Sequence, residues 1–96
     1  MSTFDVKHEE SDTKGRFFLV DDQGKTAAES TYSKAGTDKI IIDHTEVSDA
    51  LRGTGAGQAL IEAAVAHARA KGIKILPLCP FARAVIAKNK HLQDVV

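Results

Sequence analysis

Hydrophobic and polar residues alternate along the first part of the chain in the pattern of β-strands. Residues 4–8 (Phe-Asp-Val-Lys-His) alternate with period two, which predicts a half-buried strand. Residues 16–20 are more apolar and predict a second strand, followed by the turn-forming residues 21–24. A weaker strand is predicted over residues 25–33. Because the segments between these strands are short, we expect antiparallel hairpins.

The period of the pattern changes after residue 47. Residues 39–47 contain consecutive isoleucines at 40, 41 and 42, which predict a strand covered on both faces and central in the sheet. From Ala56 to Lys71 the apolar residues fall on one helical stripe, and Gly72 follows where helices commonly end. The stripe consists of Leu60, Ile61, Ala64, Val65 and Ala68.

Two more elements complete the predicted fold. Residues 73–79 predict a strand bounded by prolines, residues 81–90 predict a helix, and residues 91–96 predict no element. The order β-β-β-β-α-β-α predicts an α+β fold (an α/β mixed sheet) in a single domain over residues 1–96. Its antiparallel meander is followed by a βαβ unit, whose two strands should be parallel with a right-handed crossover.

Composition narrows the class of protein. Thirteen basic residues balance thirteen acidic ones, which argues against nucleic-acid binding. With 43% hydrophobic residues the chain is not a disordered tail, and no apolar run approaches the roughly 20 residues that span a membrane. The first residues lack the features of a signal peptide. A single cysteine allows no internal disulfide, so we expect a cytoplasmic protein.

The segment Arg52-Gly53-Thr54-Gly55-Ala56-Gly57 lies between the isoleucine strand and the long helix. Its glycines let backbone amides approach a ligand, and a helix N-terminus attracts anions. This predicts a phosphate or pyrophosphate site, the alternative being a turn in which glycine serves geometry alone. A P-loop ends in Gly-Lys-Ser/Thr, and it is excluded because Gly57 is followed by Gln-Ala. The dinucleotide-binding fingerprint G-x-G-x-x-G is excluded because its last glycine would fall at position 58 or 60, which are Gln and Leu.

Residues 47–57 resemble the acyl-CoA signature of the GNAT acetyltransferase superfamily, V-x-P-x-x-R-G-x-G-x-G, with Asp49 in place of the proline. The whole chain is similar to the short single-domain GNAT-like N-acetyltransferases through residues 44–47, 77–82 and 93–96. The resemblance implies a minimal GNAT fold, acetyl-CoA as co-substrate and transfer of acetyl to an amine. It also implies that the CoA pyrophosphate is held by the loop, through Val47, Arg52, Gly53, Thr54, Gly55, Ala56 and Gly57.

Two departures from the GNAT pattern bear on the chemistry. Val85 and Ile86 occupy the region where many GNAT enzymes carry a tyrosine that protonates the leaving thiolate. Residues 9–15 are too few for the two-helix segment with which larger GNAT proteins wall the acceptor site. We therefore expect an open acceptor site, and the sequence does not identify the acceptor.

Acetyl transfer to an amine needs a base, donors for the oxyanion and a proton for the departing thiolate. His44 and Glu46 are two residues apart on a strand, so they share a face and are candidates for the base. The alternative is that both are polar strand-end residues bonded to nearby backbone. The resemblance suggests a backbone amide around Val47 as the oxyanion donor.

Cys79 should lie near the point where the two parallel strands diverge. Three roles stay open for it: an inert packed thiol, a general acid that replaces the missing tyrosine, or a nucleophile that accepts the acetyl group.

The remaining polar candidates have simpler interpretations. We expect His8 and His67 on solvated faces and His91 in the tail, with no spacing typical of a metal site and no bound metal. Tyr32 is expected to pack in its strand. A basic group formed by Arg83, Lys88 and Lys90 is either a solvated face or a contact for the 3′-phosphate of CoA.

The sequence thus predicts an acetyl-CoA-dependent N-acetyltransferase, monomeric or homodimeric, acting on an unidentified amine. The alternative is a non-catalytic CoA or acyl-CoA binding or sensing module. A weaker third interpretation is a homodimeric interaction protein with a purely structural glycine loop.

Overall fold

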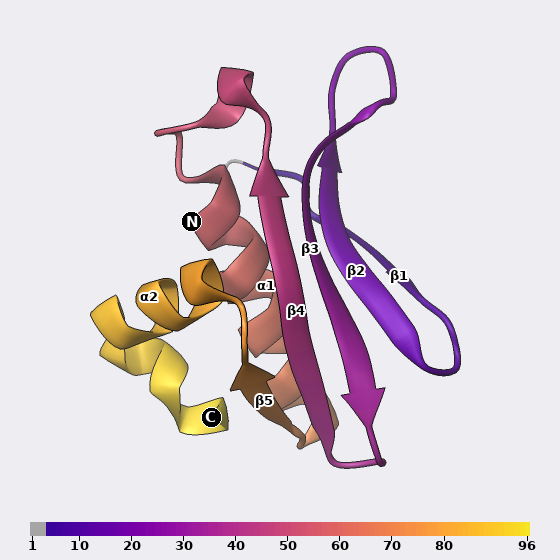
Figure 1. The fold of residues 1–96 in the computed structure, drawn as a ribbon, viewed down its shortest axis with the longest axis vertical. Helices are drawn as coiled ribbons and strands as arrows, with labels where there is room; N and C mark the ends of the chain where they lie inside the picture. The colour runs from indigo at the N-terminus through magenta and orange to yellow at the C-terminus, as the bar shows by residue number, and fades with distance from the viewer. Residues whose placement is uncertain (1–3) are drawn as a thin grey trace.

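The computed structural model describes residues 4–96, which form one five-stranded sheet with two α-helices (Figure 1). The strands are β1 (Lys7–Glu10), β2 (Lys14–Val20), β3 (Thr26–Ala35), β4 (Lys39–Val47) and β5 (Lys74–Pro77). The helices are α1 (Ala56–Lys71) and α2 (Pro80–Lys88), with short 3-10 helices η1 (Asp49–Leu51) and η2 (Lys90–Val95). This element order confirms the predicted α+β fold.

The strands follow one another across the sheet in sequence order. β1 to β4 form an antiparallel meander, whereas β4 and β5 are parallel, as predicted for the βαβ unit. β5 pairs only with the first half of β4, and its last paired residue, Pro77, lies opposite Ile42. The second half of β4 therefore has a partner strand on the β3 side alone.

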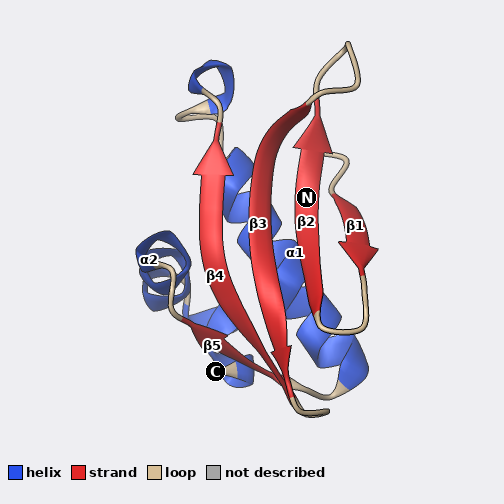
Figure 2. Cartoon of the chain, turned by 45° about the vertical axis from the view of Figure 1, so that its right-hand side comes forward, coloured by secondary structure: helices blue, strands red, loops and turns tan. Residues whose placement is uncertain are grey.

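Within residues 4–96, one face of the sheet is covered by α1, and the opposite face carries no helix (Figure 2). On β3 the buried residues Ala28, Ser30 and Tyr32 alternate with more exposed ones, as expected for a sheet covered on one side. The apolar stripe predicted for α1 is buried against this face. Gly72 ends the helix as predicted, and it adopts a left-handed conformation (φ 69°).

A bulge in β4 decides which side chains face α1. Ile42 pairs with Tyr32 and His44 with Thr31, so Asp43 is an extra residue without an opposite partner. Beyond the bulge, Thr45 lies opposite the buried Ser30. Thr45 therefore lies on the face covered by α1, and His44 lies on the uncovered face.

Several predicted boundaries and environments need correction. The isoleucine strand is interior, but it is not covered on both faces, because Ile41 is only half-buried on the face without a helix. The first strand covers Lys7–Glu10 rather than residues 4–8. The strand predicted over residues 73–79 ends at Pro77. The tail, for which no element was predicted, is the 3-10 helix η2, and its Leu92 and Val95 are buried in the core.

Within residues 4–96, no helix combines the length and the hydropathy needed to cross a membrane.

Candidate functional site

The glycine loop opens α1 with free backbone donors. Gly53 (φ 78°) and Gly55 (φ 89°) both adopt left-handed conformations that favour glycine, and Gly55 is the N-cap of α1. No side chain caps this helix end. Since the first N–H groups of an α-helix have no acceptor within the helix, the amides around Ala56 and Gly57 are available to an anion.

A groove of about 1030 Å³ begins at this loop and lies between the end of β4, the start of α1 and α2. Its walls combine backbone of the loop with apolar side chains, among them Val47, Leu51, Phe81 and Val85. Six of the seven residues predicted to bind the cofactor line it, namely Val47, Arg52, Gly53, Gly55, Ala56 and Gly57. Thr54 does not line the groove, and its amide donates to the carbonyl of Leu51.

Gly57 has a packing reason to be glycine. A Cβ at this position would lie 2.4 Å from Cζ of Phe81, so the aromatic ring at the start of α2 occupies the space where a side chain would be. By contrast, a Cβ at Gly53 or Gly55 would meet nothing within 4 Å. The loop glycines therefore serve two purposes: backbone conformation at Gly53 and Gly55, and close contact with Phe81 at Gly57.

The positive charges near the groove come from both of its sides. Arg52 lines the groove, is largely exposed and pairs with Asp49 (Nε to Oδ1, 3.2 Å). From α2, Lys88 also lines the groove. Of the predicted basic group, Arg83 and Lys90 do not line it. The groove thus has one cation near the loop and another at the far end of α2.

The open edge of β4 places one more donor beside the groove. The amide of Ser48 donates to Ala27 on the β3 side (2.8 Å). Because N–H groups alternate between the two sides of a strand, the amide of Val47 is directed to the side that β5 has left. The carbonyl of Ile42, at the point of divergence, accepts the amides of Leu78 and Cys79 instead.

His44 and Glu46 lie together on the sheet face that no helix covers. Nε2 of His44 is 3.0 Å from Oε1 of Glu46, and both side chains are exposed. Glu46 lines the groove, whereas His44 does not. β5 does not pair with this part of β4, so the edge of β4 is open beside these residues. The groove on the α1 side and the uncovered face are both reached from this open edge.

Cys79 is buried behind the groove rather than on its wall. It is the N-cap of α2, and Sγ is 3.5 Å from Oγ1 of Thr45, which does line the groove. Thr45 Oγ1 also lies 3.1 Å from Oγ of the buried Ser30. The three side chains form a continuous polar row from β3 to the start of α2.

The environment of Cys79 favours its thiolate. Burial raises the pKa of the thiol, but hydrogen bonds from the Thr45 hydroxyl and from the amides of Ala82 and Phe81 more than offset this, so the pKa is lowered overall. A thiol at a helix N-terminus that accepts amide hydrogen bonds is in the environment typical of reactive cysteines, although its burial limits access.

The expectation of a solvated face holds for His8, which is exposed, but not for His67, whose side chain is only 15% exposed. The two imidazoles also meet beside Glu10, outside the groove. Tyr32 packs in its strand as predicted, with its hydroxyl in the same cluster.

Sequence reasoning missed Thr45, Ser30, Phe81 and Asn89 as neighbours of the site. Thr45 shares its face with Val47, so the period-two pattern would have found it if the bulge at Asp43 had been foreseen. The contact between Phe81 and Gly57 joins two helices and leaves no signal in local sequence.

A glycine loop between a strand and a helix, with a groove leading to diverging parallel strands, is an arrangement that suits a phosphate-bearing ligand. The family model of the GCN5-related N-acetyl-transferases matches residues 16–95. The chain belongs to this family, and it is an acetyltransferase by class.

Solved structures agree with this assignment. The solution structure of a "GCN5-like putative N-acetyltransferase" from Staphylococcus aureus is 40% identical, with a TM-score of 0.73, over 99% of this chain and 89% of that one. A ribosomal-protein-alanine N-acetyltransferase from Brucella melitensis has a TM-score of 0.67 at 18% identity, over 81% of this chain and 62% of that one. The Escherichia coli ribosomal-protein-S18-alanine N-acetyltransferase has the same TM-score at 19% identity, over 82% and 53% of the chains. The last two comparisons bear on the fold alone, and no match was found among curated proteins.

Proposed function

We propose that the protein transfers an acetyl group from acetyl-CoA to an amine, with the groove at the start of α1 as the CoA site. The observation that carries the proposal is the run of uncapped amides at the α1 N-terminus, opening into a groove of about 1030 Å³ with apolar walls. Amides and a helix dipole suit a pyrophosphate, and an apolar channel suits a pantetheine arm. In this proposal Arg52 contacts the pyrophosphate and Lys88 the 3′-phosphate.

The acetyl carbonyl would lie at the open edge of β4, within reach of the Val47 amide. That amide would donate to the oxyanion that forms when the amine attacks the thioester carbon. The carbon–sulfur bond then breaks and releases CoA. Since the strand edge joins the two faces of the sheet, CoA would occupy the α1 face and the amine would arrive from the uncovered face.

His44 and Glu46 are the proposed base. Their side chains lie on the uncovered face, where the amine would approach, and they are in contact with each other. A neutral imidazole can take a proton from the incoming ammonium, and the neighbouring carboxylate would stabilise the imidazolium that results. We assign the proton transfer to His44 and its stabilisation to Glu46.

For the departing thiolate we assign the proton to Cys79, acting through Thr45. The thiol is hydrogen-bonded to Thr45, and Thr45 lines the groove, so a proton can pass from Sγ by way of the hydroxyl. Because Cys79 lies behind the groove wall, its Sγ is not placed to attack a thioester bound in the groove, so we do not assign it the nucleophilic role. The inert alternative is tested by the Cys79 variants described below.

The absence of the usual tyrosine supports a second candidate function, that of a CoA-binding or sensing module. Val85, in the region of the usual tyrosine, is an apolar groove wall residue, so it offers no proton there. A CoA-binding or sensing module without transfer would need the same groove and no proton donor. We also propose, from the single cysteine, a cytoplasmic location, and leave the choice between monomer and homodimer to measurement.

The test is release of free thiol from acetyl-CoA in the presence of a panel of amines, beside calorimetric titration with CoA. The proposed enzyme binds CoA and releases thiol only when a suitable amine is present. A sensing module binds CoA and releases no thiol with any amine. A protein with a purely structural loop does neither, and its melting temperature does not change with CoA.

A further inference from the structure

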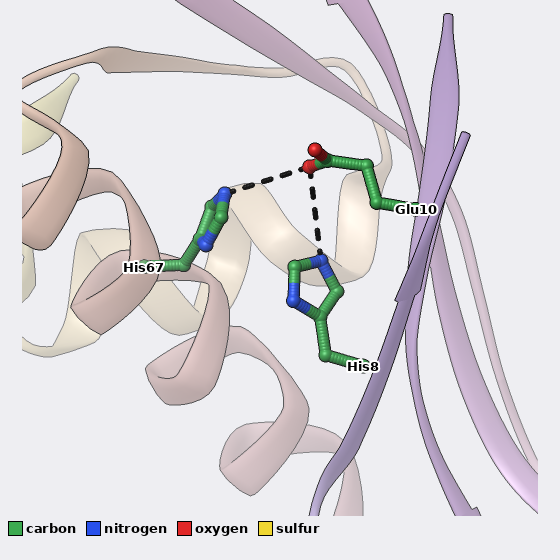
Figure 3. A group of neighbouring side chains, drawn as sticks. All are labelled: His8, Glu10 and His67. Carbon is green, nitrogen blue, oxygen red and sulfur yellow. Dashed lines mark ion pairs between the residues drawn. The ribbon is translucent and has the colours of Figure 1, made fainter. Parts of the chain in front are cut away.

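A second cluster of titratable side chains lies outside the groove, between β1 and α1 (Figure 3). His8 and Glu10 extend from β1 and His67 from α1. Nε2 of His8 is 3.9 Å and Nε2 of His67 is 3.7 Å from Oε2 of Glu10. One ligand atom of each of the three residues lies within 4.8 Å of those of the other two. None of these residues lines the groove.

We propose that His8, Glu10 and His67 form a binding site for a divalent transition metal, of the class represented by Zn²⁺. Two imidazole nitrogens and one carboxylate oxygen are a ligand set that suits such ions. Trans ligands at the usual Zn–N and Zn–O distances are about 4 Å apart and tetrahedral ones somewhat closer, so small side-chain rotations close the site.

The three ligands are held in place by their neighbours, as metal ligands usually are. The His8 ring stacks on Phe17 with centroids 4.3 Å apart. The rings of His67 and His8 pack edge to face, with their centroids 4.7 Å apart. Lys34 binds the other carboxylate oxygen of Glu10 at 2.7 Å, which leaves Oε2 directed at the two imidazoles.

The protons of the cluster are compatible with metal binding. The Tyr32 hydroxyl donates to Oε2 of Glu10, so the 2.6 Å bond between that hydroxyl and His8 must use the Nε2 proton of His8. Binding of the metal replaces this proton, which passes to solvent. Burial lowers the pKa of His67, and the positive charges of Lys71 and Lys34 lower it further, whereas the Glu10 carboxylate raises it. The ammonium groups of Lys34 and Lys71 oppose any cation and limit the affinity.

The position of the site suggests a structural role. His67 is eleven residues beyond the first residue of α1, about 17 Å along the helix, so the metal would be far from the glycine loop. Among the described strands, β1 lies at the edge of the sheet and pairs only with β2. A metal bound by both β1 and α1 would fasten this edge to the helix, which is a common means of stabilising small domains.

The test is a titration of ¹⁵N-labelled protein with ZnCl₂ at pH 7, observing the histidine ring nitrogens. We expect one equivalent of Zn²⁺ to shift the resonances of His8 and His67 together and to leave those of His44 and His91 unchanged. At a hundredfold excess of Zn²⁺ over Kd, the melting temperature should rise by about 10–20 °C.

The variants His67→Gln and His8→Gln should each weaken binding by more than the roughly 10–100-fold that loss of a supporting residue costs. His91→Gln, which removes an exposed histidine outside the cluster, should bind as the unchanged protein does. The proposal is overturned if no zinc binds, if zinc shifts His44 or blocks Cys79 instead, or if both cluster variants keep full affinity. Should a variant fail to fold, the ring-nitrogen titration of the unchanged protein decides alone.

Discussion

Glu10 combines an ion pair and a hydrogen bond on one carboxylate. The Lys34 ammonium, followed by the Tyr32 hydroxyl, lowers the pKa of Glu10 from 4.5 to about 2. Because the folded pKa lies below the unfolded one, this group stabilises the fold fully above about pH 4.5 and loses its contribution as the pH falls toward 2. Edge strand β1 is therefore expected to be sensitive to acid.

We predict that Glu10→Gln lowers the free energy of unfolding at pH 7 and has a much smaller effect at pH 2. Urea unfolding at the two pH values measures the difference. Asp22→Asn, which removes an exposed carboxylate in a turn, is the matched control and should be nearly neutral at both. Equal losses at pH 7 and pH 2 for Glu10→Gln would contradict the assignment.

Cys79 can be assigned by two measurements on one variant. In the proposed role as proton donor, Cys79→Ala keeps its affinity for CoA but loses rate by about 10²–10⁴-fold, the usual contribution of general acid catalysis. Intact-mass analysis of the unchanged protein with acetyl-CoA should show no added acetyl group. An acetyl adduct that disappears in Cys79→Ser would support the nucleophile instead, and normal turnover by Cys79→Ala would leave the thiol as packing.

At the residue scale, the sequence predicted which residues share a strand face better than which residues meet in space. The pairing of His44 with Glu46 on one face followed from strand periodicity. The meeting of His8 with His67 did not, because it depends on how β1 and α1 are placed in space, and residues so far apart in sequence carry no joint spacing. Cys79 was expected at the strand divergence, and local pattern could not reveal that Thr45 separates it from the groove.

The junction of α1 with α2 depends on the contact between Gly57 and Phe81. We predict that Gly57→Ala destabilises the protein by about 1–3 kcal/mol, because the new methyl group overlaps the Phe81 ring. In a Phe81→Ala background the same substitution should become neutral or stabilise by up to about 1 kcal/mol, since alanine is the better helix former. Denaturant unfolding of the four proteins measures the coupling. A loss of equal size in both backgrounds would show that the ring is not the cause.

The element η2 closes the core from the end of the described chain. Leu92 is 2% exposed, and Arg69 of α1 pairs with Asp94 (2.6 Å). We predict that Leu92→Ala costs about 2–5 kcal/mol of stability, the usual range for a buried leucine. Leu78→Ala, at a leucine that is 56% exposed, should cost less than about 0.5 kcal/mol. Thermal or urea unfolding compares the two, and similar losses would place η2 outside the cooperative core.

At the scale of elements, periodicity predicted the strands and helices because burial on one face repeats at a fixed spacing. It failed at residues 91–96, where Leu92 and Val95 are too few to show a period. Periodicity also gave the wrong environment for residues 40–42. Three consecutive apolar residues form the same sequence pattern whether the second face of the strand is covered by a helix or only half-buried.

At the scale of the molecule, the groove depends on three features that meet at one end of the sheet. They are the left-handed glycines before α1, the end of β5 at Pro77, opposite Ile42 of β4, and the packing of Phe81 of α2 against Gly57. The sequence indicated the first through its glycine spacing, and the βαβ order indicated that strand ends would meet there. The width of the groove and the identity of its walls depend on packing between distant segments.

The most direct test of the central claim is calorimetric titration of CoA into the unchanged protein, Arg52→Ala and Arg83→Ala. The two variants lose the same charge, but only Arg52 lines the groove. A charge-assisted hydrogen bond contributes about 1.5–3 kcal/mol to binding. Because Arg52 is exposed and also pairs with Asp49, we expect its contribution to lie at the lower end of this range. Loss of that contribution corresponds to roughly a tenfold rise in Kd. The account predicts this rise for Arg52→Ala and an unchanged Kd for Arg83→Ala. Equal affinities in all three folded proteins, or no binding of CoA at all, would contradict it.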